Sequence, residues 1–308
     1  MDPALKLEGV AKRYGRFEAV RDLSFEVEPG TICGFLGPNG AGKTSTLRMI
    51  LGLTDPSAGR ITVLGADDGR KVRDRIGFLP EERGLYRKIT PIDAIAFFAG
   101  LKGVPLGEGR KRARRMLEEQ GLEASMKKPM KALSKGMAQK VQLMAAIAHE
   151  PELVILDEPF SGLDPVNQQG LEKVIHDLAA RGATVLFSTH VMQHAERLCK
   201  KVVLLANGRK VFEGSIDQAR NTAPRHVELE GRIAPDQVSG LPGVAAVEST
   251  AVPGVEDGVQ IHRASLAASA DPQEALKAAF ARGLDVRRFE MRQPTLHDAF
   301  IVLTGGDR

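Results

Sequence analysis

The sequence predicts an α/β fold built on a parallel β-sheet with helices on both faces. Two apolar runs carry this prediction, residues 153–156, which end at Asp157 and Glu158, and residues 183–190. Between them, residues 166–180 have apolar side chains at helical spacing. Apolar strands that alternate with helices are typical of a doubly wound parallel sheet, in which each strand is buried on both faces.

A glycine-rich loop is the third observation. The apolar run 31–36 precedes it and a helix-like segment, residues 45–51, follows it. Two glycines around four residues and then Lys-Thr, between a strand and a helix, are the P-loop pattern. Glycines let backbone N–H groups turn toward a phosphate, and the helix N-terminus adds partial positive charge. The sequence therefore predicts a nucleoside triphosphate site formed by Gly37, Pro38, Asn39, Gly40, Ala41, Gly42, Lys43, Thr44 and Ser45.

Four side chains have expected roles around the triphosphate. Lys43 would reach the β- and γ-phosphates, and the Thr44 hydroxyl would bind Mg²⁺. Asp157 ends a buried strand, where its carboxylate can hold Mg²⁺ through bound water, and Glu158 is placed to orient and polarise the attacking water. Phosphoryl transfer depends mostly on such positioning and charge neutralisation.

The first part of the chain contains further short elements. Alternating residues predict strands at 5–10 and 23–28, and another strand follows the loop helix at 59–65. A helical region runs from about 90 to 150. Its basic segment 110–115 has no interleaved aromatic residue, so we interpret it as a solvated helix face and expect no nucleic-acid partner.

The character of the sequence changes near residues 221–224, which predicts two domains, 1–222 and 223–308. In the second domain, strand-like and helix-like pieces follow one another in the order β-α-β-β-α-β, at 226–230, 233–239, 243–248, 257–263, 271–282 and 284–291. This order predicts a small α+β unit of ferredoxin-like type, and a last helix follows residues 294–295.

Composition sets broad limits. The net charge is +4 with a pI near 9.1, which suits anionic partners without selecting one. Cys33 and Cys199 have no metal-ligand spacing, and we expect both to be free thiols. The first residues lack a signal-peptide pattern, and no apolar run approaches the roughly 18 residues that cross a bilayer. A membrane function would need spanning segments from another chain.

Three more segments complete a motif set: 133–140, 161–164 and 188–190. With the loop at 37–44 and the pair Asp157-Glu158, they make the sequence from about 5 to 220 resemble an ABC-type ATPase, the nucleotide-binding subunit of an ABC transporter. The resemblance implies a mixed-sheet core with an antiparallel β subdomain and a helical subdomain. Residues 289–300 look like the end of the small appended domain of sodium- and drug-export types.

The resemblance also implies roles for individual residues. Tyr14 would stack on adenine, and His190 would be the switch histidine that contacts the γ-phosphate. The signature loop would comprise Ser134, Lys135 and Gly136, and Asp164 would belong to the D-loop. We interpret the remaining histidines as surface or core residues.

Three positions depart from the family pattern. Glu81 stands where a glutamine usually contacts Mg²⁺ and the attacking water. A carboxylate there can still face Mg²⁺ and accept from water, so we include Glu81 among the catalytic and metal-binding candidates. Lys135 replaces a glycine and Met137 a glutamine in the signature. These changes bear on the rate of hydrolysis rather than on ATP binding.

By resemblance, ATP lies between the loop of one subunit and the signature of a second, so we expect a homodimer or heterodimer. The expected function is to power export through separate transmembrane permease subunits at the cytoplasmic face of the membrane. We hypothesise that residues 81–102, including Tyr86 and Phe97, dock on such a subunit. Two alternatives remain open: a soluble ABC-type ATPase without a membrane partner, and a weakly hydrolysing, ATP-gated regulatory module.

Overall fold

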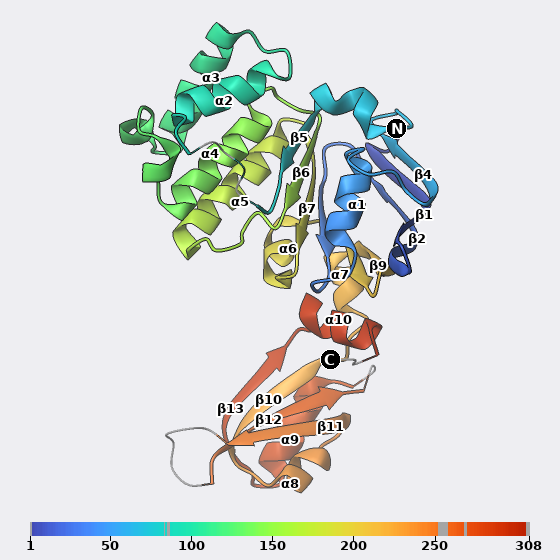
Figure 1. The fold of residues 1–308 in the computed structure, drawn as a ribbon. Helices are drawn as coiled ribbons and strands as arrows, with labels where there is room; N and C mark the ends of the chain where they lie inside the picture. The colour runs from blue at the N-terminus through green and yellow to red at the C-terminus, as the bar shows by residue number, and fades with distance from the viewer. Residues whose placement is uncertain (1, 83, 85–86, 252–257, 268–269, 306–308) are drawn as a thin grey trace. The chain divides into compact units, whose positions relative to one another are not determined.

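The computed structural model describes residues 2–82, 84, 87–251, 258–267 and 270–305. Its contacts divide the chain into two compact units, residues 1–216 and 217–308 (Figure 1). The domain boundary predicted after residue 222 stays a prediction.

The first unit is built around a six-stranded sheet. In spatial order its strands are β5 (Ile76–Leu79), β6 (Leu153–Asp157), β7 (Thr184–Thr189), β3 (Ile32–Leu36), β8 (Lys201–Ala206) and β9 (Arg209–Ser215). The first five are parallel, and β9 returns antiparallel to β8. The sheet is therefore mixed, with the strands that the sequence predicted at its centre.

Both faces of the central strands are covered, which explains their uninterrupted apolar sequences. All residues of β3, β6 and β7 are buried. Helix α1 (Lys43–Ile50) contacts β6, and helices α5 (Pro165–Ala180) and α6 (Met192–Leu198) contact β3 and β7. In Figure 1, α1 lies on one side of these strands and α5 and α6 lie on the other.

A second, three-stranded antiparallel sheet has the order β2 (Phe17–Val27), β1 (Leu5–Tyr14), β4 (Ala58–Val63). Its inner residues share one apolar cluster with α1 and with one face of the central sheet, for example Leu7, Phe25 and Phe35. The first two strands are longer than the predicted 5–10 and 23–28. They form one hairpin whose distal half has irregular register and exposed charged residues between a few buried ones, such as Val20, so regular apolar alternation marks only its other half.

The predicted helical region contains α2 (Pro91–Gly100), α3 (Leu106–Glu119) and α4 (Lys135–Ile147). These helices share a separate apolar cluster that includes Ile95, Leu117, Val141 and Met144. Helix α4 also contacts β5, which joins this helical part to the central sheet. Within the described residues, no helix has the length and apolarity needed to span a membrane.

The second unit has the predicted β-α-β-β-α-β order. Its elements are β10 (His226–Arg232), α8 (Pro235–Ser239), β11 (Val244–Ala251), β12 (Gln260–Leu266), α9 (Pro272–Ala281) and β13 (Asp285–Arg292), followed by α10 (Leu296–Leu303). The strands pair antiparallel in the order β11-β12-β10-β13, so β12 lies between the two strands joined by α8. This split β-α-β topology is the ferredoxin-like arrangement.

Candidate nucleotide-binding site

The glycine-rich loop leads from β3 into α1 and leaves no room for side chains at two of its glycines. Gly42 is the N-cap of α1 with φ 98°, and a Cβ there would lie 2.6 Å from the carbonyl oxygen of Ala19. A Cβ at Gly37 would lie 2.4 Å from the carbonyl oxygen of Leu205. Only glycine tolerates both the left-handed φ and the close backbone approach at residue 42. The loop is thus shaped to present backbone N–H groups, as a phosphate requires.

Lys43 is the buried cation of this loop. Its side chain is 6% exposed, and Nζ donates to the carbonyl oxygens of Gly37 at 2.7 Å and Pro38 at 3.2 Å. The same Nζ lies 3.5 Å from Glu158 Oε1. The first turn of α1 contains no acidic residue. The ammonium group and the helix N-terminus therefore give this loop a positive potential that favours an anion.

A buried hydrogen-bond network fixes the end of β6. The Ser188 hydroxyl donates to Asp157 Oδ1 and accepts from the N–H of Glu158 at 3.1 Å. Glu158 adopts φ 46°, a left-handed conformation that costs a non-glycine residue about 1–3 kcal/mol. Its N–H also reaches the Ser188 carbonyl oxygen at 3.2 Å. Ser188 thus fixes the carboxylate of Asp157 and the backbone of Glu158 at the end of β7.

His190 follows β7 and completes the cluster. Its Nδ1 lies 3.0 Å from Glu158 Oε1, the oxygen that also faces Lys43. The N–H of Gly37 donates to the Thr189 carbonyl oxygen at 3.3 Å, which joins the loop to the end of β7. The carboxyl ends of β3, β6 and β7 therefore bring together the predicted phosphate loop, the carboxylate pair and the histidine.

Two other predicted residues lie outside this cluster. Glu81 is exposed and follows β5, whose last residue Leu79 pairs with Leu156 in β6. This register places Glu81 at the same edge of the sheet as Glu158. Tyr14 ends β1 with 46% of its surface exposed, and Lys12 Nζ lies 5.2 Å from its ring centre.

The signature residues lie at a different place in the unit. Ser134 is the N-cap of α4 and Asp164 the N-cap of α5. The two N-termini are adjacent, because a Cβ at Gly136 would lie 2.6 Å from Nδ2 of Asn167. Ser134 and Lys135 are exposed. In Figure 1, α4 and α1 lie on opposite sides of the central strands, so one copy does not bring its own signature to its own loop.

The donor set fits magnesium rather than a metal held by protein alone. Within the described part of the chain, no group of three or more His, Cys, Asp or Glu side chains is placed to hold a metal ion. Mg²⁺ is usually held by one or two carboxylates together with water and substrate phosphates. The half-buried Thr44 at the start of α1 and the buried Asp157 are suitable contributors of this kind.

Sequence reasoning missed the role of Ser188 and the surroundings of His194. His194 is 5% exposed, stacks on Phe160 with ring centres 4.1 Å apart, and accepts at Nδ1 from Arg197 at 2.9 Å. His194 is a core residue, which is one of the two environments expected for the histidines other than His190. Both cysteines are free, as expected, and both are buried; burial raises the pKa of the Cys33 thiol to about 12.

A glycine-lined loop, a buried lysine and a carboxylate pair at the ends of parallel strands define a P-loop NTPase. Residues 20–161 match the family model described as ABC transporter. The chain is 37% identical over 302 residues to the ABC transporter ATP-binding protein YhaQ of Bacillus subtilis (strain 168), covering 98% of each chain. It is 34% identical over 305 residues to the Nod factor export ATP-binding protein I of Burkholderia pseudomallei (strain K96243), covering 98% of this chain and 97% of the relative.

A solved structure described as the ATP-binding subunit of an ABC transporter matches with a TM-score of 0.65 and 34% identity. The match covers 70% of this chain and 92% of that one. The chain belongs to the ATP-binding subunits of ABC transporters. It is an ABC-type ATPase, and the predicted fold class is confirmed.

Proposed function

We propose that this chain powers export through separate transmembrane subunits, by closing a dimer around ATP and releasing it after hydrolysis. The observation that carries the proposal is the position of Glu158, whose Oε1 faces both Lys43 and His190 in a largely buried cluster. A carboxylate held this way beside a phosphate loop is suited to orient the attacking water.

Within one copy, each residue has a distinct task. The loop 37–45 binds the phosphates through its N–H groups, and Lys43 exchanges its carbonyl partners for phosphate oxygens. A bound Mg²⁺ would supply positive charge against the negative charge that develops during phosphoryl transfer. The metal ion would be held by Thr44, Asp157 and, from the neighbouring strand end, Glu81.

Glu158 orients the attacking water. His190 holds Glu158 through one ring nitrogen, and the other ring nitrogen of His190 is available to the γ-phosphate. Tyr14 stacks on adenine.

The second copy would supply Ser134, Lys135, Gly136 and Asp164. The support for this is that α4 and α1 lie on opposite sides of the central strands (Figure 1) and that the two helix N-termini that carry these residues are adjacent. Shifting a two-state equilibrium from 1:99 to 99:1 takes about 5.5 kcal/mol. Hydrogen bonds to charged groups give roughly 1.5–3 kcal/mol each. Two γ-phosphates that each accept two such bonds are enough to close the dimer.

We further propose that residues 81–102 form the contact with the permease. A cavity of about 300 Å³ lies beside this segment, lined by Phe78, Pro80, Gly84, Phe98 and Gln142 among others. Phe97 is 44% exposed next to it. Tyr86, the other predicted docking residue, lies outside the described residues.

Phe97→Ala is expected to leave ATP turnover of the isolated chain unchanged and to weaken co-purification with the membrane subunit. Unchanged co-purification and transport would contradict the docking proposal. The export direction draws on relatives named for Nod factor export. The cytoplasmic face of the membrane is the corresponding location.

A second candidate is an ATP-gated module with little turnover. Glu81 favours it, because a carboxylate adds negative charge beside the γ-phosphate. Met137 favours it less, because its half-buried side chain packs against the apolar cluster of the helical part. Co-purification of the chain with membranes separates both candidates from a soluble ATPase without a membrane partner.

Steady-state ATP hydrolysis tests the proposal. Glu158→Gln removes the carboxylate after β6 and is expected to lower turnover at least a hundredfold. Glu152→Gln is the matched control, since this carboxylate precedes the same strand and pairs with Arg75 on the surface at 2.6 Å. It is expected to retain turnover within twofold. Equal and negligible turnover in wild type and Glu158→Gln would favour the gated module.

A further inference from the structure

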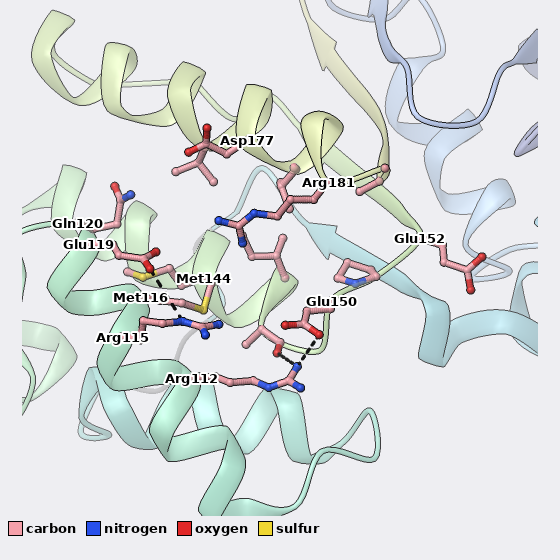
Figure 2. Close-up of a pocket in the computed structure, with 17 residues that line it drawn as sticks. Arg112, Arg115, Met116, Glu119, Gln120, Met144, Glu150, Glu152, Asp177 and Arg181 are labelled. Carbon is pink, nitrogen blue, oxygen red and sulfur yellow. Dashed lines mark hydrogen bonds and ion pairs between the residues drawn. The ribbon is translucent and has the colours of Figure 1, made fainter.

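A second cavity, remote in sequence from the phosphate loop, lies between three helices of the first unit (Figure 2). Its volume is about 370 Å³, and its walls come from the C-terminal halves of α3, α4 and α5 and from the segments that follow α4 and α5. This size lies in the range of roughly 300–1,000 Å³ found for small-molecule sites. None of the predicted nucleotide-site residues lines it.

The interior of the cavity is apolar. Met144 and Ile147 of α4 are buried, whereas Met116 of α3 and Val174 and Leu178 of α5 are half-buried and border the cavity. Unbranched methionine side chains adapt to ligands of different shape. These walls favour a ligand with a flexible apolar body.

Arginine side chains at the rim have unused hydrogen-bonding capacity. Arg181 extends from the end of α5 into the space between α5 and α3 (Figure 2). Its side chain makes no hydrogen bond or ion pair with any residue that the structure describes, although its charge, after the hydrogen bond from Lys173, helps to lower the pKa of the nearby Asp177 carboxyl group. Among the described residues, the side chain of Arg115 has only a 3.9 Å ion pair with Glu119. Arg112, by contrast, is held by the Ala148 carbonyl oxygen at 3.0 Å and by Glu150 at 3.3 Å.

Two acidic side chains at the rim make their ion pairs with cations other than Arg181 and Arg115. Asp177 pairs with Lys173 at 2.8 Å, and Glu152 pairs with Arg75 at 2.6 Å. The planar guanidinium group binds a carboxylate through two parallel hydrogen bonds. A carboxylate entering the rim would therefore meet a guanidinium whose donors are free.

We propose that this cavity binds a small amphipathic carboxylate, with the apolar body between α3, α4 and α5 and the carboxylate on Arg181 and Arg115.

The position of the cavity couples it to the signature residues, a step that rests on the proposed function. Helices α4 and α5 run side by side: Gly136 lies against Asn167, Lys140 Nζ lies 3.6 Å from the Cβ position of Gly170, and Met144 and Val174 line the cavity together. Their N-termini carry Ser134 and Asp164, and their C-terminal halves wall the cavity. A ligand bound between the C-terminal halves of α4 and α5 changes the packing of the two helices whose N-termini present Ser134 and Asp164.

Sodium decanoate, titrated below its micellar concentration into the nucleotide-free full chain, tests the site. The methyl resonances of ¹³C-methyl methionine report position, and Met116→Leu and Met144→Leu assign the two signals. We expect both signals to shift saturably. Arg181→Gln is expected to weaken binding at least fivefold, whereas Arg114→Gln, an exposed arginine of α3 outside the cavity, leaves it within twofold.

Decylammonium, which has the same tail and the opposite charge, is expected to bind at least tenfold more weakly. Absence of a saturable shift, or equal binding of decylammonium, overturns the proposal without bearing on ATP hydrolysis. Saturable decanoate binding that leaves ATP turnover unchanged overturns only the coupling to the signature residues.

Discussion

The Ser188 hydroxyl is the most informative single group to remove, because the carboxylate of Asp157 and the backbone of Glu158 both hydrogen-bond to it. Ser188 is fully buried, donates to Asp157, which is 3% exposed, and accepts from the N–H of Glu158 at 3.1 Å. A hydrogen bond to a buried charged group contributes about 1.5–3 kcal/mol. Without the hydroxyl, the N–H of Glu158 still has the Ser188 carbonyl oxygen as a partner at 3.2 Å. Loss of the hydrogen bond between this N–H and the hydroxyl therefore adds little to the loss of stability. Ser188→Ala is therefore expected to lower the free energy of unfolding by about 2–3 kcal/mol.

The same substitution is expected to lower kcat for ATP hydrolysis by about tenfold or more, because Glu158 loses one of the hydrogen bonds that hold its left-handed backbone. A tenfold change corresponds to about 1.4 kcal/mol in the activation free energy. Urea unfolding of the full chain by circular dichroism measures stability, since the sequence has no tryptophan. Ser161→Ala removes an exposed hydroxyl from the nearby loop and is expected to change stability by less than about 0.5 kcal/mol. A Ser188→Ala chain as stable as this control would refute the reasoning.

Three further predictions concern the loop, a buried histidine and adenine. Gly42→Ala places a Cβ 2.6 Å from the Ala19 carbonyl oxygen and should weaken binding of a fluorescent ATP analogue at least tenfold. Burial lowers the pKa of His149 to about 4, so its neutral form contributes stability above pH 6.5 that is lost as pH falls toward 4. After a discount for partial exposure, this contribution to the free energy of unfolding is about 1–2 kcal/mol. His149→Gln should therefore reduce, by up to that amount, the unfolding free energy that the chain loses between pH 7 and pH 5. Tyr14→Ala should raise the Kd for ATP about fivefold or more, from lost stacking of about 1–3 kcal/mol, whereas Phe17→Ala should not.

The central elements were predictable because burial on both faces leaves a plain apolar signature. The predicted strand at 153–156 and helix at 166–180 differ from β6 and α5 by one residue each. The order of elements in the second unit was also predicted, although among the described residues of its strands only β10 and β12 contain buried ones, largely at alternate positions, while β13 has none that is buried. The distal half of the first hairpin was missed, because register shifts and exposed charged residues interrupt its few buried apolar residues, such as Val20, and leave no regular alternation in the sequence.

The site was predictable as a set of motifs but not as a network. The loop glycines, Lys43 and Glu158 follow from local sequence, and the structure brings Lys43, Glu158 and His190 together. The role of Ser188 depends on the register that pairs it with Asp157 across parallel strands, which no local pattern contains. The contact between Gly136 and Asn167 likewise arises only when two helices pack. The assigned roles of these residues in ATP chemistry stay predictions.

The most direct measurement of the central claim is the mass of the Glu158→Gln chain by sedimentation velocity in saturating Mg-ATP and in Mg-ADP. The account predicts a dimer with ATP and a monomer with ADP, because the γ-phosphate of each nucleotide holds the signature residues of the other copy. A chain that stays monomeric in both nucleotides, alone and beside its membrane subunit, would contradict the account.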